Sequence, residues 1–297
     1  LNGKTQIFPL KNGIDFLGFH TYLTSTGKVV RKVRAKSIDN MKRKIRKFRG
    51  LVDRKKMTLE SVAQSYASWT GHISHGNTYH LMPQKLGNLP NKAKIKFGSL
   101  YGAPIIWIKA DKNHAGYPAN SVTLVTNQII KMLCFDAIES ANGNSDRRNY
   151  GNNRYIWSNL RKWLNSDAGA GAWYTAQHSA DAPPSTANVW NGVNQYQTLA
   201  GFLNAFSANE RAALLDTTII VGKSSTDGGG TETCVDKIFP LSCTEVGLSG
   251  DHVCGSKLAI FSDNSSRVAT VTASCVANSN YSSNPSANSA WYYWLRD

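Results

Sequence analysis

Apolar residues spaced like one face of a helix define the first strong element of the sequence, over residues 36–49. They recur at steps of three and four positions: Ile38, Met41, Ile45 and Phe48. This spacing places them on one side of an α-helix, and all remaining residues from 42 to 49 are lysine or arginine. We expect a helix that packs on one side and displays positive charge on the other, with Ser37 capping its start and Gly50 ending it.

The residues before this helix have the composition of extended structure. Residues 14–23 are rich in aromatic and β-branched side chains, and residues 28–33 have the same character. A turn at 25–27 is expected to join them, and a tight hairpin is expected at 16–20. The pattern therefore predicts a small antiparallel sheet that leads directly into the basic helix.

A second helix is predicted after the basic one. Thr58 is placed to cap its start, and the helix is expected to end near Gly71. Its apolar side is predicted to consist of Leu59, Val62, Tyr66 and Trp69. A short element at 77–86 then leads to a glycine- and proline-containing break at 87–91.

Beyond residue 97 the sequence is rich in glycine, asparagine, serine, threonine and aromatic residues. Ser158 is expected to cap a short helix at 158–165 whose buried side holds Leu160, Trp163 and Leu164. A longer amphipathic helix is predicted at 202–215, with a local start signal at 207–210. Strands are expected at 103–108, 122–125, 219–221 and 238–241, the last two joined through a turn at 227–230. Together with the first part, these elements predict an α+β fold.

The basic residues are concentrated in the first third of the sequence. Residues 1–97 contain 20 lysines and arginines against 4 aspartates and glutamates, and residues 98–297 contain 14 against 15, which gives net charges of +16 and −1 and the overall +15. A charge run is usually a solvated surface helix without a ligand. Here the asymmetry between the two parts favours a polyanionic partner for the first part alone.

Several features limit the setting in which the protein works. No stretch approaches the roughly 18 apolar residues of a membrane span, and no signal peptide pattern is visible. We expect the chain, which opens on Leu1, to be cut at both ends. Five cysteines without a secretory signal predict reduced thiols, with a disulfide among the last four as the alternative. We expect a cytoplasmic protein, with surface display of the second part of the chain as the alternative.

Three motifs in the first part carry a resemblance to a known family. They are the hairpin at 15–20, the basic helix at 42–48 and the helix end at 65–72. Residues 8–85 resemble the C-terminal end of a bacterial reverse transcriptase of the group II intron and diversity-generating retroelement type. In such enzymes the hairpin helps to hold the primer end, and the thumb domain grips the template–primer duplex through its backbone. The resemblance implies binding of RNA or of an RNA–DNA duplex.

The resemblance assigns expected roles to individual residues. The primer-holding hairpin would consist of Phe16, Leu17, Gly18 and Phe19. The nucleic-acid-binding residues would be Arg31, Arg34, Lys36, Lys42, Arg43, Arg46, Lys47 and Arg49. Gripping a duplex without regard to sequence requires several such cationic contacts with phosphates.

The carboxylates of a polymerase active site are not found in this sequence. Polymerase chemistry needs carboxylates that hold two metal ions, and these lie in the palm, upstream of such a hairpin. No Tyr-x-Asp-Asp run occurs here. We therefore expect no catalytic residues and no cofactor in this chain, with magnesium only in a palm that the chain lacks.

A second resemblance covers residues 98–297 and rests on five separated motifs. They lie at 104–107, 155–165, 201–210, 238–246 and 294–296. Together they resemble a bacterial and phage domain family of C-type lectin fold with no assigned enzymatic activity. Members of this family include target proteins of diversity-generating retroelements. The resemblance implies ligand binding, to a protein or a glycan, by a domain that we expect to be truncated at its C-terminus.

The candidate ligand-binding residues come from loop-like parts of this region. Residues 278–289 are rich in asparagine and serine, which suits a segment rewritten by adenine-directed reverse transcription and equally suits an ordinary loop. Tryptophans inside strand and helix patterns are expected in the core: Trp107, Trp157 and Trp163. Trp294, like the loop tryptophans, is a surface candidate. The predicted ligand-binding residues are Trp190, Asn280, Tyr281, Asn284, Trp291 and Tyr293.

The sequence shows no recognisable metal or nucleophile motif. None of the paired Cys-x-x-Cys spacings of structural zinc sites occurs, so we expect no metal site. Phosphate-binding loops and Ser-His-Asp patterns are also missing from the sequence. His72, His75 and His80 are expected to cap the thumb-like region or to contact a duplex.

These observations lead to one hypothesis and two alternatives. We expect two domains: residues 1–90, a nucleic-acid-binding hairpin and thumb, and residues 91–297, a lectin-like domain. The hypothesis is a non-catalytic fragment of a retroelement reverse transcriptase joined to a ligand-binding domain that is a diversification target. The first alternative is part of an active RNA-directed DNA polymerase whose palm lies upstream. The second is a ligand-binding or surface-adhesion protein with a basic arm that adheres to nucleic acid.

Overall fold

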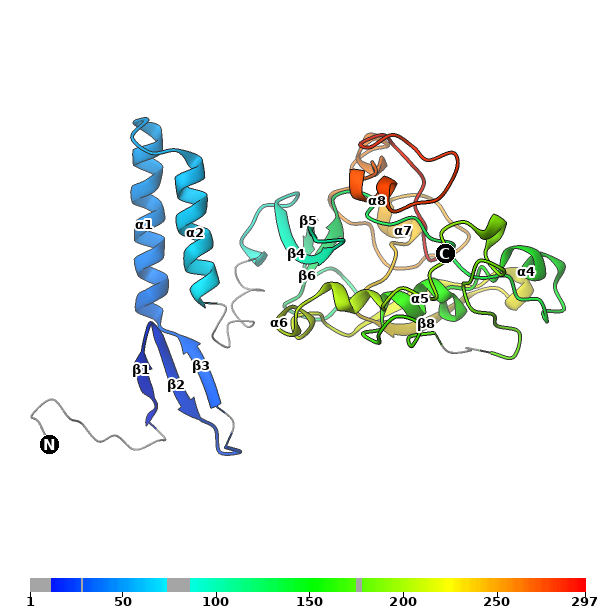
Figure 1. Ribbon diagram of the computed structural model, residues 1–297, viewed down its shortest axis with the longest axis horizontal. Coiled ribbons are helices and arrows are strands. Elements are labelled where there is room, and N and C mark those ends of the chain that lie inside the picture. Colours follow the sequence, from blue (N-terminus) through cyan, green and yellow to red (C-terminus); the bar gives the residue numbers. More distant parts are fainter. Residues whose placement is uncertain (1–11, 28, 74–85, 175–177) are drawn as a thin grey trace, which may run out of the picture. The chain divides into compact units, whose positions relative to one another are not determined.

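Two compact units make up the chain, Leu1–Met82 and Pro83–Asp297. Figure 1 shows the computed structural model, which describes residues 12–27, 29–73, 86–174 and 178–297. Both units contain helices and antiparallel strands, so the predicted α+β class is confirmed. The predicted element at 77–86 lies, apart from its last residue, outside the described residues, as do His75 and His80.

The segment just after the unit boundary packs with the second unit. Lys109 Nζ donates hydrogen bonds to the carbonyls of Gly87 and Leu89 at 3.1 and 2.6 Å. Lys109 lies on a strand of the second unit and is 5% exposed, so these bonds tie the segment to that unit's sheet. The sequence analysis placed the domain boundary slightly later, after residue 90.

A three-stranded antiparallel sheet opens the first unit, in the order β1-β2-β3. Its strands are β1 (Ile14–Phe16), β2 (Phe19–Leu23) and β3 (Val29–Val33). Leu17 and Gly18 form the predicted tight hairpin with φ angles of 45° and 84°, the positive values that a two-residue turn of this kind requires. The predicted turn before β3 is also present, closed by a 3.0 Å hydrogen bond from Gly27 N to Thr24 O.

Helix α1 (Ala35–Asp53) is amphipathic as predicted but longer. Met41 and Phe48 are buried, whereas Ile45, expected on the same side, is 40% exposed. Gly50 does not end the helix. The chain stays helical past it because Leu51 and Val52 continue the partly buried side, and Arg54 Nε donates to the Gly50 carbonyl at 2.7 Å.

The predicted cap of α1 is wrong. The residue before the helix is Arg34, which makes no side-chain capping hydrogen bond, and Ser37 lies inside the first turn. Its hydroxyl instead faces the neighbouring helix, where Trp69 Nε1 approaches it at 3.5 Å. The serine is therefore used between helices rather than at a helix end.

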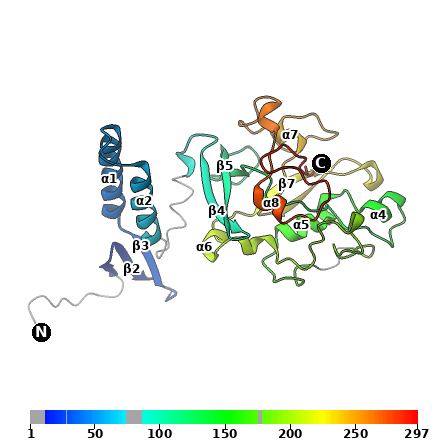
Figure 2. The same cartoon turned by 45° about the horizontal axis from the view of Figure 1, so that its top comes forward.

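Helix α2 (Leu59–Ile73) packs beside α1 in both views of the molecule (Figures 1 and 2). The Thr58 cap is confirmed, because its Oγ1 accepts a hydrogen bond from Ser61 N at 3.2 Å. Two helices alone cover only a narrow stripe of each other. Consequently Leu59 and Tyr66 at the edge of the predicted apolar side remain 73% and 41% exposed, while Ile73 is buried.

The second unit contains one three-stranded sheet and one hairpin, all antiparallel. The sheet consists of β4 (Lys94–Leu100), β5 (Ala103–Lys112) and β6 (Val122–Thr126). The hairpin consists of β7 (Thr217–Gly222) and β8 (Thr231–Asp236). Predicted strands at 103–108, 122–125 and 219–221 are confirmed. The one at 238–241 is wrong, because the glycine turn is short enough for the residues directly after it to pair with β7.

The helices that lie wholly within the described residues of the second unit are short: α4 (Ser145–Tyr150), α5 (Asn159–Leu164), α6 (Ala208–Arg211), α7 (Cys243–Val246) and α8 (Ala273–Ala277). Single 3₁₀ turns lie at 155–157, 190–192, 202–205, 225–227 and 265–267. Helix α5 confirms the prediction at 158–165, since Ser158 Oγ accepts from Arg161 N at 3.1 Å and Trp163 is buried. Leu164 is only partly buried.

The continuous helix predicted at 202–215 is wrong. A 3₁₀ turn over 202–205 ends at Phe206, which adopts extended angles and is 3% exposed in the core. The predicted start signal is confirmed: Ser207 and Glu210 form a capping box that begins α6. The aromatic ring of Phe206 can enter the core only if the helix breaks there, so packing overrides the helical periodicity.

Aromatic rings dominate the main core of the second unit. Trp107 on β5 and Trp163 on α5 are buried in it with Trp173, Tyr196 and Phe202. Trp173 and Tyr196 stack with centroids 5.5 Å apart. None of the helices in the described part of the chain has the length and hydrophobicity needed to cross a membrane.

Candidate nucleic-acid interface and aromatic pocket

Most positive charges of α1 lie away from its packed side, and Lys44 lies beside that side, with its Nζ 5.5 Å from the centroid of the Phe48 ring. Every lysine and arginine from 42 to 49 is exposed: Lys42, Arg43, Lys44, Arg46, Lys47 and Arg49. Met41 and Phe48 on the opposite side are only 5% and 7% exposed. The helix therefore holds its cations in a fixed row, which removes much of the entropic cost of binding a row of phosphates.

The remaining predicted nucleic-acid-binding residues lie near the start of the same helix. Arg31 is on β3, and Arg34 and Lys36 lie at the junction between β3 and α1; all three are exposed. Arg34 pairs with Asp15 at 3.0 Å, so part of its charge is already balanced. The structure thus brings the eight predicted residues onto one continuous strand and helix.

A cavity of about 560 Å³ lies between the hairpin turn, the start of α1 and the end of α2. Three cationic residues line it, Arg34, Lys36 and Lys44, together with hydroxyl groups from both helices and the Trp69 ring. Cations, hydroxyls and an aromatic face are the groups that bind a phosphate and stack on a base. The cavity is therefore chemically suited to one end of a nucleic-acid strand.

The predicted hairpin residues do not all face this cavity. Gly18 lines it, Phe19 is buried, and Phe16 and Leu17 are each 67% exposed at the tip. His72 on α2 holds the turn, because its Nε2 lies 2.8 Å from the Leu17 carbonyl and its ring contacts Phe19 at 5.2 Å. His72 therefore has a positioning role, as the expectation of a capping histidine suggested.

A larger pocket of about 1080 Å³ opens in the second unit, and we call it the aromatic pocket. Core rings line its interior, exposed rings line its mouth (Tyr150, Trp190, Tyr281, Tyr292, Tyr293 and Trp294), and the half-buried Trp291 lines it as well. Tyr150 and Trp190 lie 5.2 Å apart, and Trp294 contacts Phe135 at 5.5 Å. Ligand pockets of this size are typically lined by aromatic side chains with a few polar groups that orient the ligand.

Four of the six predicted ligand-binding residues line the aromatic pocket: Trp190, Tyr281, Trp291 and Tyr293. Asn280 instead forms reciprocal hydrogen bonds with Asn194, at 2.6 and 3.0 Å, and thereby braces the segment beside the pocket. Asn284 donates to the Ser279 carbonyl at 3.3 Å within its own loop. Neither asparagine is among the residues that line the pocket.

Sequence reasoning missed several residues of this pocket. Tyr150 ends a helix that the sequence analysis did not predict, and Tyr292 was not singled out although it lies among the closing aromatic residues. The density of aromatic residues over 291–294 was the available signal. Phe135 carried no signal, because an isolated phenylalanine in a loop is indistinguishable from core in the sequence.

Comparison with protein families identifies the second unit more closely. Residues 120–297, more than half of the chain, match the family model of DUF6273, a domain of unknown function. The chain belongs to the DUF6273 family. Comparisons with curated proteins and with solved structures give no match.

Within the DUF6273 region, several motif residues from the sequence analysis meet in a buried ion pair. Arg296 donates to both carboxylate oxygens of Glu245 at 2.6 and 2.7 Å, and neither side chain is more than 1% exposed. Tyr117 donates to the same carboxylate, and burial, reinforced by the Glu245 charge, raises the pKa of Tyr117. Burial alone would lower the pKa of Arg296, but its bonds to Glu245 raise it. The pair is a structural link between α7 and the closing segment.

Other charges of the DUF6273 region are paired in the same way. Arg161 on α5 binds Asp236 at 3.0 Å, and Tyr155 donates to Asp236 at 3.0 Å. Arg147 binds Asp227 through two hydrogen bonds, one of 3.0 Å. Asp227 would have a raised pKa from burial alone, but the bonds from Arg147 lower it. These charges are used for internal links between elements.

The five cysteines of the DUF6273 region are free thiols, which confirms the prediction of reduced cysteines. Burial raises the pKa of Cys254 to about 12 and of Cys275 to about 11. The pKa values of Cys134 and Cys234 are raised to about 12 for the same reason. Because the thiolate is the reactive form, these residues are suited to packing rather than to nucleophilic chemistry.

Proposed function

We propose that this protein is a nucleic-acid-binding fragment of a retroelement reverse transcriptase joined to a lectin-like, ligand-binding DUF6273 domain. The first unit grips the template–primer duplex without catalysing synthesis. The second unit binds a protein or glycan and is a target of sequence diversification. Such a protein works in the cytoplasm, where the retroelement RNA is found.

One observation carries the nucleic-acid part of the proposal. All six lysines and arginines between 42 and 49 are exposed on a helix whose other side is packed against its own unit. A solvated surface helix usually mixes both signs of charge, whereas this stretch of α1 displays one sign only. The adjoining cavity adds cations, hydroxyls and an aromatic ring where the duplex end would lie.

The aromatic pocket supports the ligand-binding part of the proposal. Exposed tryptophan and tyrosine rings gather at its mouth, a composition typical of binding surfaces because these rings offer large contact areas at low entropic cost. The asparagine- and serine-rich segment adjoins it through Tyr281. A mutable loop beside such a pocket would change ligand specificity without disturbing the core.

The nucleic-acid proposal is tested by the salt dependence of binding. The variant Lys42→Gln, Arg43→Gln, Arg46→Gln, Lys47→Gln removes the four charges that lie opposite Met41 and Phe48. The unmodified chain is expected to bind an RNA–DNA duplex with a slope of log affinity against log salt on the order of −4 to −6. The variant is expected to lose about 3 to 4 of that slope, since each phosphate contact contributes about 0.9. Fluorescence anisotropy with a labelled duplex measures both.

A matched control replaces four exposed lysines of the second unit: Lys94→Gln, Lys112→Gln, Lys162→Gln and Lys257→Gln. It changes the net charge equally and is expected to leave the slope within about 1 of the original. Equal slopes for both variants would contradict a specific role of α1. Equal affinity for the duplex and for single-stranded RNA would favour the adhesive basic arm over a thumb.

Ligand binding is tested at the mouth of the aromatic pocket. Trp190→Ala removes a ring that is 59% exposed and is expected to abolish binding to whichever oligosaccharide or peptide of a panel the unmodified chain recognises. Tyr101→Ala, an exposed ring outside the pocket, is the control. Equal binding by both variants, measured by calorimetry, would remove the pocket from the proposal.

A further inference from the structure

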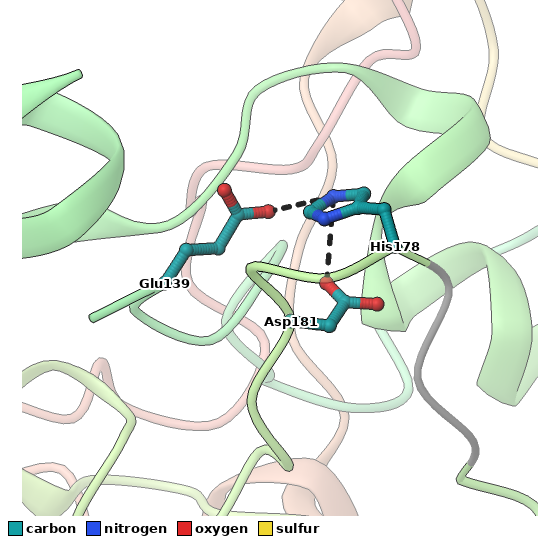
Figure 3. Close-up of side chains that lie close together, drawn as sticks. All are labelled: Glu139, His178 and Asp181. Carbon is teal, nitrogen blue, oxygen red and sulfur yellow. Dashed lines mark ion pairs between the residues drawn. The ribbon is translucent and has the colours of Figure 1, made fainter. Parts of the chain in front are cut away.

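Three potential metal ligands meet in the second unit, and none of them is among the residues that line the two cavities described above. Figure 3 shows the carboxylate of Glu139 and the carboxylate of Asp181 directed toward the ring of His178. His178 Nε2 lies 3.0 Å from Glu139 Oε1 and 3.6 Å from Asp181 Oδ1. The side chains of Glu139, His178 and Asp181 are 0%, 18% and 1% exposed. The cluster is thus nearly closed to solvent.

The spacing of these atoms matches neighbouring ligands around one ion. For metal–ligand bonds of about 2.0–2.2 Å, adjacent ligand atoms lie roughly 3.0 Å apart in an octahedral shell and roughly 3.4 Å apart in a tetrahedral one. The distances of 3.0 and 3.6 Å from His178 Nε2 are close to these values. All three ligand atoms lie within 4.8 Å of one another.

The imidazole nitrogen in this cluster is not satisfied by protein groups. His178 Nε2 is buried and makes no well-directed hydrogen bond to any described residue, although Glu139 Oε1 is only 3.0 Å away. The His178 ring is held from behind by Trp157, whose centroid lies 4.6 Å away in an edge-to-face arrangement. A fixed imidazole whose nitrogen points at two carboxylates presents the nitrogen and oxygen ligands that Zn²⁺ takes.

The charge balance around the cluster also calls for a cation. Glu139 receives hydrogen bonds from Asn142 and Asn152, which are neutral amides. Gathering two buried carboxylates around one imidazole is costly unless positive charge is supplied.

We propose that Glu139, His178 and Asp181 bind a divalent transition-metal ion, with Zn²⁺ as the best fit. One imidazole nitrogen and two carboxylate oxygens form a donor set that Zn²⁺ accepts, whereas Ca²⁺ and Mg²⁺ prefer oxygen ligands only. The site contains no pairs of cysteines, which is why the expectation of no metal site overlooked it. The nearly complete burial of both carboxylates assigns the ion a structural role.

The ion would fasten the segment 178–194, whose last residues line the aromatic pocket. His178 and Asp181 belong to this segment, and Trp190 at the pocket mouth follows them along the chain. Glu139 comes from the separate segment before α4, and Ile138 N already donates to the Asn188 carbonyl of segment 178–194 at 2.7 Å. Metal binding and the position of Trp190 are therefore linked. This inference does not rest on nucleic-acid binding by the first unit.

The test is zinc binding by the full chain after removal of metals with a chelator. Calorimetry with ZnCl₂ is expected to show one ion bound per chain at this site. His178→Gln and Asp181→Asn are each expected to weaken zinc binding. Removing an outer partner of a metal ligand costs roughly 10- to 100-fold in affinity, and removing the ligand itself is expected to cost more. Far-UV circular dichroism of each variant establishes that it is folded. Co²⁺ gives a second readout, because its visible absorption reports imidazole and carboxylate coordination directly.

His252→Gln is the matched control, since this histidine contacts the Lys223 carbonyl at 2.9 Å outside the cluster. It is expected to bind Zn²⁺ like the unmodified chain. Identical zinc affinities for the unmodified chain, His178→Gln and Asp181→Asn would overturn the proposal. So would tighter binding of Ca²⁺ or Mg²⁺ than of Zn²⁺, because the imidazole would then contribute nothing.

Discussion

The two units of this protein use charged side chains in opposite ways. In the first unit the cations of α1 are displayed to solvent beside a small core. In the second unit, arginines and carboxylates from separate elements are joined inside the fold, with the Glu245–Arg296 pair almost fully buried. A charged residue can thus be exposed, as on α1, or paired inside the fold, as in the second unit. The sequence around a residue can predict exposure, whereas pairing depends on a partner that is distant in the sequence.

The largest effect is expected from breaking the buried pair. Arg296→Met leaves the Glu245 carboxylate unpaired among buried groups and is expected to cost about 3–5 kcal/mol of the free energy of unfolding. Urea titration followed by tryptophan fluorescence measures it, because seven of the eight tryptophans belong to the second unit. The double variant Glu245→Leu, Arg296→Met is expected to recover a large part of the loss. A loss below about 1 kcal/mol for the single variant would mean that the pair is hydrated.

A smaller loss is expected from the core of the first unit. Phe48→Ala removes a 7% exposed ring from the side where α1 packs, and is expected to cost about 2–3 kcal/mol, below the 3–5 kcal/mol typical of a large core. Far-UV circular dichroism in urea follows the two helices. Ile45→Ala, at 40% exposure on the same helix, is the control and is expected to cost less than about 1 kcal/mol. Equal losses would place Ile45 in the core, against the structure.

Acid is expected to destabilise the second unit through its paired carboxylates. The pKa of Asp227 is lowered by Arg147, so its contribution to stability is complete above the unfolded value of about 3.9 and is lost as pH falls below it. The tryptophan-monitored stability of the second unit is therefore expected to fall below about pH 4. Arg147→Gln is expected to reduce that slope and to lower stability at neutral pH. An unchanged slope would show that other carboxylates dominate.

The smallest effect on stability is expected where the charge is greatest. Lys47→Gln on α1 is expected to change the free energy of unfolding by less than about 0.5 kcal/mol, because its side chain is exposed. The same change is expected to reduce the salt slope of duplex binding by about 1. A loss of stability with an unchanged salt slope of duplex binding would mean that Lys47 supports the fold rather than contacting phosphate.

Local patterns predicted the elements whose structure depends on nearby residues. The amphipathic α1, the Thr58 and Ser158 caps and the Ser207–Glu210 capping box all follow from residues within four positions of one another. The glycine turn after β7 was predicted for the same reason. The helix prediction at 202–215 failed for a different reason. The helix expected at 202–215 breaks because Phe206 is drawn into a core formed by distant residues.

The candidate sites differ in the same way: one depends on neighbouring residues and the other on residues distant in the sequence. The basic row on α1 is encoded within a single helix, so the sequence alone indicates both its residues and its exposed face. The aromatic pocket was predicted in part, through the rings of Trp190, Tyr281, Trp291 and Tyr293. Its interior depends on Phe135 and on core residues from several elements. Which rings share a pocket is a property of the packed chain.

Composition and short-range periodicity were thus enough to establish the α+β class, the basic helix and the concentration of positive charge in one part of the chain. Packing alone decided the pairing of Glu245 with Arg296 and the convergence of Glu139, His178 and Asp181. Arg296 lies 51 residues after Glu245, and Glu139 comes from a segment separate from the one that holds His178 and Asp181, so no periodicity connects the groups of either set. A side chain's partner across the fold is chosen by the free energy of burying both together, and that energy exists only once the chain has folded.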